Sequence, residues 1–95
     1  MKSQDKAAAV QPRLGEEGAL FGARLRELRI ARGLTQPEIA AHVGTSASNI
    51  SDLERGIKVP TLTTVARLAE ALDCNVSELV EVLDRKPRKG RTRKG

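Results

Sequence analysis

The chain has 95 residues, 39% of them hydrophobic, and Phe21 is its only aromatic residue, so it can build at most one small domain with an aliphatic core. Its single cysteine, Cys74, excludes an intrachain disulfide and a cysteine-based zinc site. No apolar run reaches the length of a membrane-spanning helix or a secretory signal, so we expect a cytoplasmic protein without a membrane partner.

The net charge of +5 is concentrated at the C-terminal end. Residues 85–95 contain no acidic side chain, and the other 84 residues carry ten basic and twelve acidic groups, a net charge of −2. A disordered basic tail of this kind is typical of segments that bind polyanions, although a purely solvated tail has the same composition. Its seven cations are Arg85, Lys86, Arg88, Lys89, Arg91, Arg93 and Lys94.

The N-terminal part divides near Gly18. Residues 1–18 mix alanine, glutamine, glycine, proline and charged residues without a firm period, which predicts a disordered arm. A helix then follows, and Gly33 is well placed to end it because glycine readily adopts left-handed geometry. The apolar residues of this helix recur at helical spacing, at Leu20, Phe21, Leu25 and Leu28.

A second helix begins at a strong start signal. Thr35 can cap it, Glu38 stands three residues later as a capping box requires, and Pro37 lies in the first turn. Gly44 stops the helix after about two turns. Its apolar stripe is Ile39, Ala40 and Val43.

Three further helices are predicted after Gly44. Ser46 caps the first, which Gly56 ends, and Thr61 and Ser77 cap the other two, with a turn at 73–75 between them. The inward-facing residues that we expect are Ile50 and Leu53, then Leu62, Val65, Leu68, Ala69 and Leu72, then Leu79, Val80 and Leu83. No strand pattern appears, so the sequence predicts an all-α fold.

The junction of the second and third helices points to a function. Ala40 is small enough for two helices to cross closely, Gly44 permits a tight turn, and Ile50 and Leu53 can seal the wedge between the helices. A short helix that projects from the body in this way can enter the major groove of DNA, which is about 12 Å wide.

These residues also carry a family resemblance. The run from Leu34 to Gly44 (LTQPEIAAHVG), followed by Ser46, NIS at 49–51, LERG at 53–56 and Pro60, resembles the Cro/phage-repressor (XRE) helix-turn-helix family. The likeness covers about residues 20–83. It implies a compact five-helix, lambda-repressor-like domain over 19–84, between the arm and the basic tail, that binds a palindromic operator in double-stranded DNA as a homodimer and acts as a transcriptional repressor.

The resemblance also implies roles for individual residues. Arg29 and Glu54 would form a structural pair that joins the first and third helices. The tail would add non-specific DNA contacts. The residues that would face base edges are Ala47, Ser48, Ser51 and Asp52. Those that would touch the DNA backbone are Gln36, Ser46, Asn49, Arg55 and Lys58.

The expected base readers are short. Ala47 can pack on a thymine methyl group, and Asp52 can accept a hydrogen bond from cytosine N4, but many relatives have longer side chains at these two positions. Either the protein depends on DNA shape and on its tail for affinity, or the recognition helix has lost strict base reading.

Two other functions stay open. An antitoxin would use the same fold on its own operator and would also bind a toxin, and a protein-interaction module would use the fold with weak DNA binding. For the fifth helix, inward packing and a dimer seam at Leu79, Val80 and Leu83 are both possible. We expect no enzyme, no cofactor and no metal site, because His42 is the only histidine and no catalytic set or phosphate loop accompanies it.

Overall fold

A computed structural model describes the backbone of residues 2–84 and the side chains of residues 16–84. The described residues form five α-helices: α1 (Lys2–Ala31), α2 (Gln36–Val43), α3 (Ala47–Glu54), α4 (Leu62–Leu72) and α5 (Val76–Val80), followed by a 3-10 turn, η1 (Glu81–Leu83). Every regular element in this range is therefore helical, and the all-α, five-helix prediction is confirmed.

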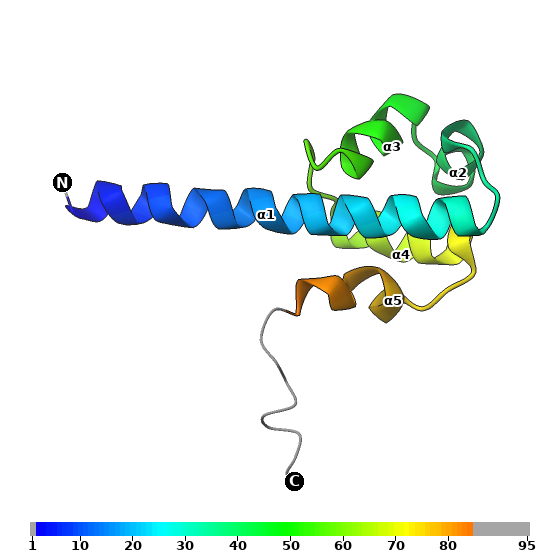
Figure 1. The fold of residues 1–95 in the computed structure, drawn as a ribbon. Coiled ribbons are helices and arrows are strands. Elements are labelled where there is room, and N and C mark those ends of the chain that lie inside the picture. Colours follow the sequence, from blue (N-terminus) through cyan, green and yellow to red (C-terminus); the bar gives the residue numbers. More distant parts are fainter. Residues whose placement is uncertain (1, 85–95) are drawn as a thin grey trace, which may run out of the picture.

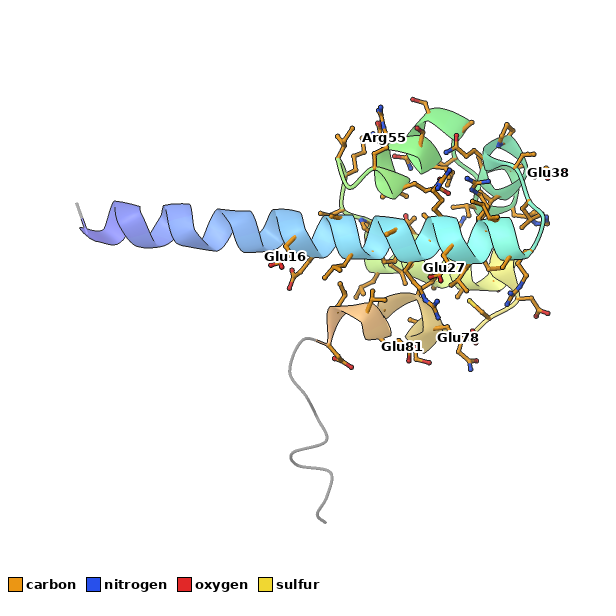
Figure 2. All side chains as sticks on the ribbon, viewed as in Figure 1. Glu16, Glu27, Glu38, Arg55, Glu78 and Glu81 are labelled. Carbon is orange, nitrogen blue, oxygen red and sulfur yellow. The ribbon has the colours of Figure 1, made fainter. Side chains whose placement is uncertain are left out.

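The helices surround one end of the long α1 (Figure 1). Helix α3 packs against α1 on one side, and α5 with η1 packs against it on the other, while α4 contacts both α2 and α5. Figure 2 shows Arg55 and Glu38 on the α3 side of α1, and Glu78 and Glu81 on the α5 side. Arg24 of α1 holds α5 in place, since its Nε donates to the Glu78 backbone oxygen at 2.8 Å.

A single, largely aliphatic core lies between the helices, and most of its predicted members are confirmed. The residues predicted and found to be buried include Leu25, Leu28, Ile39, Val43, Ile50, Leu53, Val65, Leu68 and Leu72. Leu79 is also fully buried, so the fifth helix uses this residue to pack inward. Val80 and Leu83 are half-buried.

The expected inward position of Leu62 is wrong, because its side chain is 87% exposed. Leu62 is the first residue of α4 and shares its face with Val65, but no element covers this first turn. The apolar stripe of α4 therefore continues past the edge of the core.

The predicted start and stop signals act as expected for α2, α3 and α4. The Thr35 hydroxyl accepts from the Glu38 N–H at 3.1 Å, and the Glu38 carboxylate accepts from the Thr35 N–H at 2.8 Å, which completes the capping box. Ser46 and Thr61 likewise cap α3 and α4.

The cap of α5 differs from the prediction. It is Asn75, not Ser77, and its N–H donates to the Glu78 carboxylate at 3.3 Å. The helix begins earlier because Asp73 adopts a left-handed conformation (φ +55°) that ends α4, and Asn75 then already has the extended backbone of an N-cap.

The N-terminal segment is described as part of α1, with side chains from residue 16 onward, and the expectation of a disordered arm over 1–18 stays a prediction. Helix α1 begins at Lys2 and runs without a break into the segment that packs on α3. Residues 2–11 are rich in strong helix formers, including three consecutive alanines at 7–9, whereas Pro12, Gly15 and Gly18, which separate them from residues 19–31, each disfavour a helix. Gly18 is buried, which shows that α1 packs on the body from there onward.

Candidate nucleic-acid interface

The turn between α2 and α3 is closed by backbone hydrogen bonds to one carbonyl. The N–H groups of Gly44 and Thr45 donate to the Ala40 oxygen at 2.8 and 2.9 Å, and Gly44 has φ +85°. Ala40 itself is buried, and α2 and α3 are in contact. The small residue and the glycine therefore allow the close packing that the sequence predicted, and Ser46 starts α3 two residues after the turn.

Helix α3 has one buried face and one accessible face. Ile50, Leu53 and Glu54 are buried against the body. The four residues assigned to base contacts lie among the accessible ones: Ser48 is exposed, and Ala47, Ser51 and Asp52 are half-buried. The accessible face includes the first turn of α3, where free backbone N–H groups and the helix dipole favour a phosphate.

Asp52 lies at the centre of a polar cluster at the C-terminal half of α3, which we call the Asp52 cluster (Asn49, Asp52, Arg55 and Lys58). Its two carboxylate oxygens pair with Arg55 at 3.2 Å and with Lys58 at 3.6 Å. The Lys58 ammonium also donates to the Asn49 side-chain oxygen at 3.3 Å. The structure therefore brings together one predicted base reader and three predicted backbone contacts, and it pairs them with one another.

Two predicted phosphate contacts have additional partners within the fold. The Gln36 amide donates to the Glu54 carboxylate at 3.0 Å, so it faces α3 and links α2 to α3. The Asn49 amide donates to the Thr45 hydroxyl at 3.0 Å. Sequence reasoning did not identify Thr45 as a partner; its place directly before the Ser46 cap, four residues before Asn49, is the signal that could have done so.

Arg29 and Glu54 form the ion pair that the family resemblance implies. Arg29 donates from both Nε and Nη2 to the Glu54 carboxylate, and its Nη1 donates to the Leu34 oxygen at 2.8 Å. Only 11% of the Arg29 side chain and 2% of the Glu54 side chain are exposed. The hydrogen bond that Arg29 donates to Glu54 raises the pKa of Arg29 above its usual value, against the opposing effect of burial.

A close contact between α1 and α3 was missed by sequence reasoning. A Cβ atom on Gly22 would lie 2.3 Å from the Leu53 oxygen and 2.6 Å from the Glu54 oxygen, so only glycine fits there. Gly18, one turn earlier on the same face, lies against Gly56. The spacing of Gly18 and Gly22 was the available signal, because residues four apart share a helix face. The backbone of α1 thus sets the position of α3.

Other candidate chemistry lies away from this interface. His42 is exposed near the end of α2, and no group of three or more possible metal ligands occurs among the described residues. Cys74 is half-buried, and burial raises the pKa of its thiol. None of the helices described is long and apolar enough to cross a membrane. The seven cations of the predicted tail lie outside the described residues.

Comparison with known proteins agrees with this geometry. A family model described as "Helix-turn-helix domain" matches residues 20–82, which include all of α2, α3, α4 and α5.

The chain belongs to this helix-turn-helix family. It is of the Cro/phage-repressor type that the motif around Gly44 resembles.

An uncharacterized HTH-type transcriptional regulator of Sinorhizobium fredii, y4dJ, is 43% identical over 68 residues, which cover 72% of this chain and 88% of that protein. The cryptic phage CTXphi transcriptional repressor RstR of Vibrio cholerae is 34% identical over 61 residues, covering 64% of this chain and 55% of RstR.

Two solved structures have the same fold. The restriction-modification controller protein C.AhdI of Aeromonas hydrophila superposes with a TM-score of 0.67 at 40% identity, over 68% of this chain and 94% of C.AhdI. The clp gene regulator ClgR of C. glutamicum superposes with a TM-score of 0.65 at 31% identity, over 68% of this chain and 84% of ClgR. This helix-turn-helix protein is accordingly a DNA-binding transcriptional regulator that acts on double-stranded DNA.

Proposed function

We propose that the protein is a dimeric repressor that places α3 in the major groove at each half of an inverted-repeat operator. The observation that carries this proposal is the position of α3, whose first turn and polar face remain accessible while its apolar face is buried against α1 and α2. A helix held in this way can present its N-terminal residues to base edges, as in other helix-turn-helix proteins.

In this proposal the residues at and around α3 divide into base readers and phosphate contacts. Ala47, Ser48, Ser51 and Asp52 face base edges. The contacts to the DNA backbone come from Gln36, Ser46, Asn49, Arg55 and Lys58. Phosphate contacts set register and affinity, and base contacts set sequence preference. Because serine can bond to either donor or acceptor edges, shape recognition would supplement Ser48 and Ser51.

The basic tail would add phosphate contacts without sequence preference. If about four of its cations engage, removal of residues 85–95 should reduce the log–log salt dependence of binding by roughly 3–4 units. An unchanged salt dependence would show that the tail does not contact DNA.

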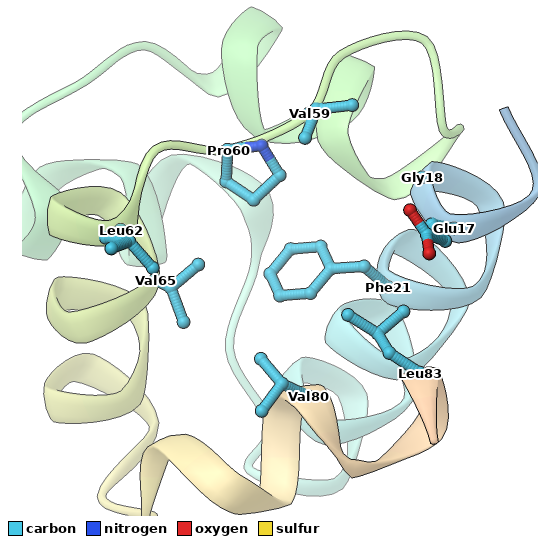
Figure 3. Close-up of a pocket in the computed structure, with 9 residues that line it drawn as sticks. All are labelled: Glu17, Gly18, Phe21, Val59, Pro60, Leu62, Val65, Val80 and Leu83. Carbon is cyan, nitrogen blue, oxygen red and sulfur yellow. The ribbon is translucent and has the colours of Figure 1, made fainter. Parts of the chain in front are cut away.

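The proposed dimer uses an apolar surface beside α5. A pocket of about 210 Å³ opens between α1, the loop before α4 and η1 (Figure 3). Phe21, Val65, Val80 and Leu83 line it, and the protruding Leu62 stands at its edge. A protruding apolar side chain next to an apolar pocket is self-complementary under two-fold symmetry, so a second copy of this chain is the partner that we propose. Two-fold operators require such pairing, since their half-sites lie about 34–36 Å apart.

Leu62→Ser tests this dimer. Because Leu62 is 87% exposed, the substitution should leave the fold intact while it weakens self-association. Sedimentation equilibrium of the full chain should show a shift toward monomer. Ile30→Ser is the matched control, because Ile30 is also exposed (53%) but does not line this pocket. If both variants associate as the unaltered protein does, this surface is not the dimer interface.

The DNA-binding proposal is tested by selection from a random duplex library at about 150 mM salt, where counterion release weakens non-specific contacts. An enriched inverted repeat is the expected result, and substitution of Ser48 by alanine should change the preferred base at one position in each half-site. Binding without enrichment that disappears as salt rises would contradict sequence-specific reading by α3.

A further inference from the structure

The Asp52 cluster has a charge arrangement that DNA binding must disturb. Among the described residues assigned to DNA contacts, Arg55 and Lys58 are the only cations, and both pair with the same carboxylate. The cations are well exposed, with 63% of the Arg55 side chain and 54% of the Lys58 side chain accessible, whereas Asp52 is 22% exposed. The single carboxylate of Asp52, a residue of the recognition helix, thus offsets part of the positive charge of the two cations that should attract phosphate.

Asp52 also fixes the loop that carries these cations. Its backbone oxygen accepts hydrogen bonds from the N–H of Ile57 at 2.9 Å and from that of Lys58 at 3.4 Å. The backbone contacts would remain if the side-chain carboxylate lost its charge. The side chain of Asp52 can therefore be changed electrostatically while the path of the loop is kept.

We propose that the Asp52 carboxylate is a specificity-determining counter-ion that competes with DNA phosphates for Arg55 and Lys58. This inference rests on the proposed binding of DNA by α3. On a non-operator sequence the carboxylate keeps the two cations or faces phosphate and acceptor edges, so binding is weak. On an operator that presents a cytosine N4 amino group at this position, the carboxylate accepts a hydrogen bond from the base and releases both cations to phosphates.

The physical basis is a competition between exposed ion pairs. Pairs with such exposed cations are weak and are readily exchanged for other partners in water. The phosphate backbone repels a carboxylate that has no hydrogen-bond donor from a base. This repulsion therefore acts on every DNA sequence that lacks such a donor at this position. Asp52 would therefore raise specificity by lowering the affinity for wrong sequences, which is discrimination by a repulsive element.

Asp52→Asn tests the proposal, because it removes the charge and keeps the shape. Binding of the full chain to the selected operator and to an unrelated duplex is measured by fluorescence anisotropy at several salt concentrations. We expect affinity for the unrelated duplex to rise about tenfold, its salt dependence to steepen by roughly one unit, and operator affinity to change much less. Glu70→Gln is the matched control, because it makes the same charge change on exposed Glu70 in α4, away from α3.

A double-mutant cycle shows whether Asp52 acts through the two cations. In a variant that already carries Arg55→Gln and Lys58→Gln, Asp52→Asn should raise the affinity for the unrelated duplex by less than about threefold, because the competition has been removed. If Asp52→Asn does not fold, Asp52→Ser replaces it in the same cycle.

The outcomes separate this inference from the proposed function. If Glu70→Gln raises the affinity for the unrelated duplex as much as Asp52→Asn does, the counter-ion role is overturned, while operator selection by the unaltered protein would still stand. If Asp52→Asn lowers the affinity for both the operator and the unrelated duplex and also lowers the melting temperature, Asp52 has a structural role only, and the counter-ion role is again overturned. Failure of the unaltered protein to select any sequence would overturn the proposed function itself.

Discussion

Helix α3 carries two carboxylates two residues apart, Asp52 and Glu54, and they lie in opposite environments. Glu54 is 2% exposed at its side chain and is bound by Arg29 and Gln36. Asp52 is 22% exposed and pairs with the accessible Arg55 and Lys58. The same type of interaction, an ion pair between a carboxylate and arginine, therefore occurs on both sides of one short helix.

The difference shows how burial changes the consequence of an ion pair. The Arg29–Glu54 pair is shielded from water, and the Glu54 carboxylate also accepts a hydrogen bond from the Gln36 amide. Loss of Arg29 or Glu54 therefore leaves the other as a buried charge without compensation. Around Asp52 water and phosphate can replace either partner, so the pair contributes little to stability and is free to exchange. One side of α3 holds the helix in place, and the other side is available for DNA.

The largest expected effect comes from Arg29→Met, which leaves Glu54 buried without its cation. We expect a loss of about 3–5 kcal/mol in the free energy of unfolding. Urea denaturation followed by circular dichroism measures it. Arg29→Met combined with Glu54→Gln should recover much of the loss because the stranded charge is removed; a single substitution that costs less than about 1 kcal/mol would contradict the structural role of the pair.

A smaller loss is expected from Gly22→Ala, which tests whether the backbone of α1 sets the position of α3. The new Cβ would lie 2.3 Å from the Leu53 oxygen, so one helix must move, at a cost of about 2 kcal/mol or more. Gly18→Ala is the control, since its Cβ would lie 3.3 Å from the Gly56 oxygen and alanine gains about 1 kcal/mol of helix propensity. Equal losses in the two variants would show that α1 and α3 do not approach so closely at Gly22.

Arg55→Met should change the free energy of unfolding by less than about 1 kcal/mol, because its pair with Asp52 is exposed. The same denaturation experiment in high salt should reduce even this difference, as expected for a screened pair. A loss as large as that of Arg29→Met would remove the distinction between the two sides of α3.

The smallest effect is expected from alkaline pH. The hydrogen bond that Arg29 donates to Glu54 raises the pKa of Arg29 above its usual value, so its contribution to stability is fully present below the pKa of arginine in the unfolded chain and is lost as the pH rises through the raised pKa. Because arginine in an unfolded chain loses its proton only in strongly alkaline solution, the stability difference between the unaltered protein and Arg29→Met should stay constant from about pH 7 to 10. A stability difference that decreases between about pH 7 and 10 would contradict the persistent charge of Arg29.

Much of the fold could be predicted from local patterns. Thr35, Pro37 and Glu38 determine where α2 begins, and Gly44 determines where it ends, because capping and left-handed geometry depend on a few adjacent residues. The buried faces of α2, α3 and most of α4 followed from helical spacing. The motif around Gly44 also led to the helix-turn-helix family.

Predictions failed where the outcome depended on what lies next to a segment. Leu62 fits the apolar stripe of α4, but no neighbouring element covers it. For Leu79 the sequence left inward packing and a dimer seam open, and the structure shows it buried where Arg24 holds α5 against α1. The close approach at Gly22 depends on the Leu53 and Glu54 oxygens, which lie about 30 residues further along the chain.

The sequence by itself determined the five helices, most of their caps, most of the aliphatic core and the helix-turn-helix family, because these depend on local propensity and on periodic burial. Only the tertiary structure decided that Gln36 bonds to Glu54, that Gly22 sets the distance between α1 and α3, and that Asp52 pairs with both Arg55 and Lys58. The physical reason is that hydrogen bonds and ion pairs extend only a few ångströms, so side-chain partners are settled only when the packed helices bring them within reach.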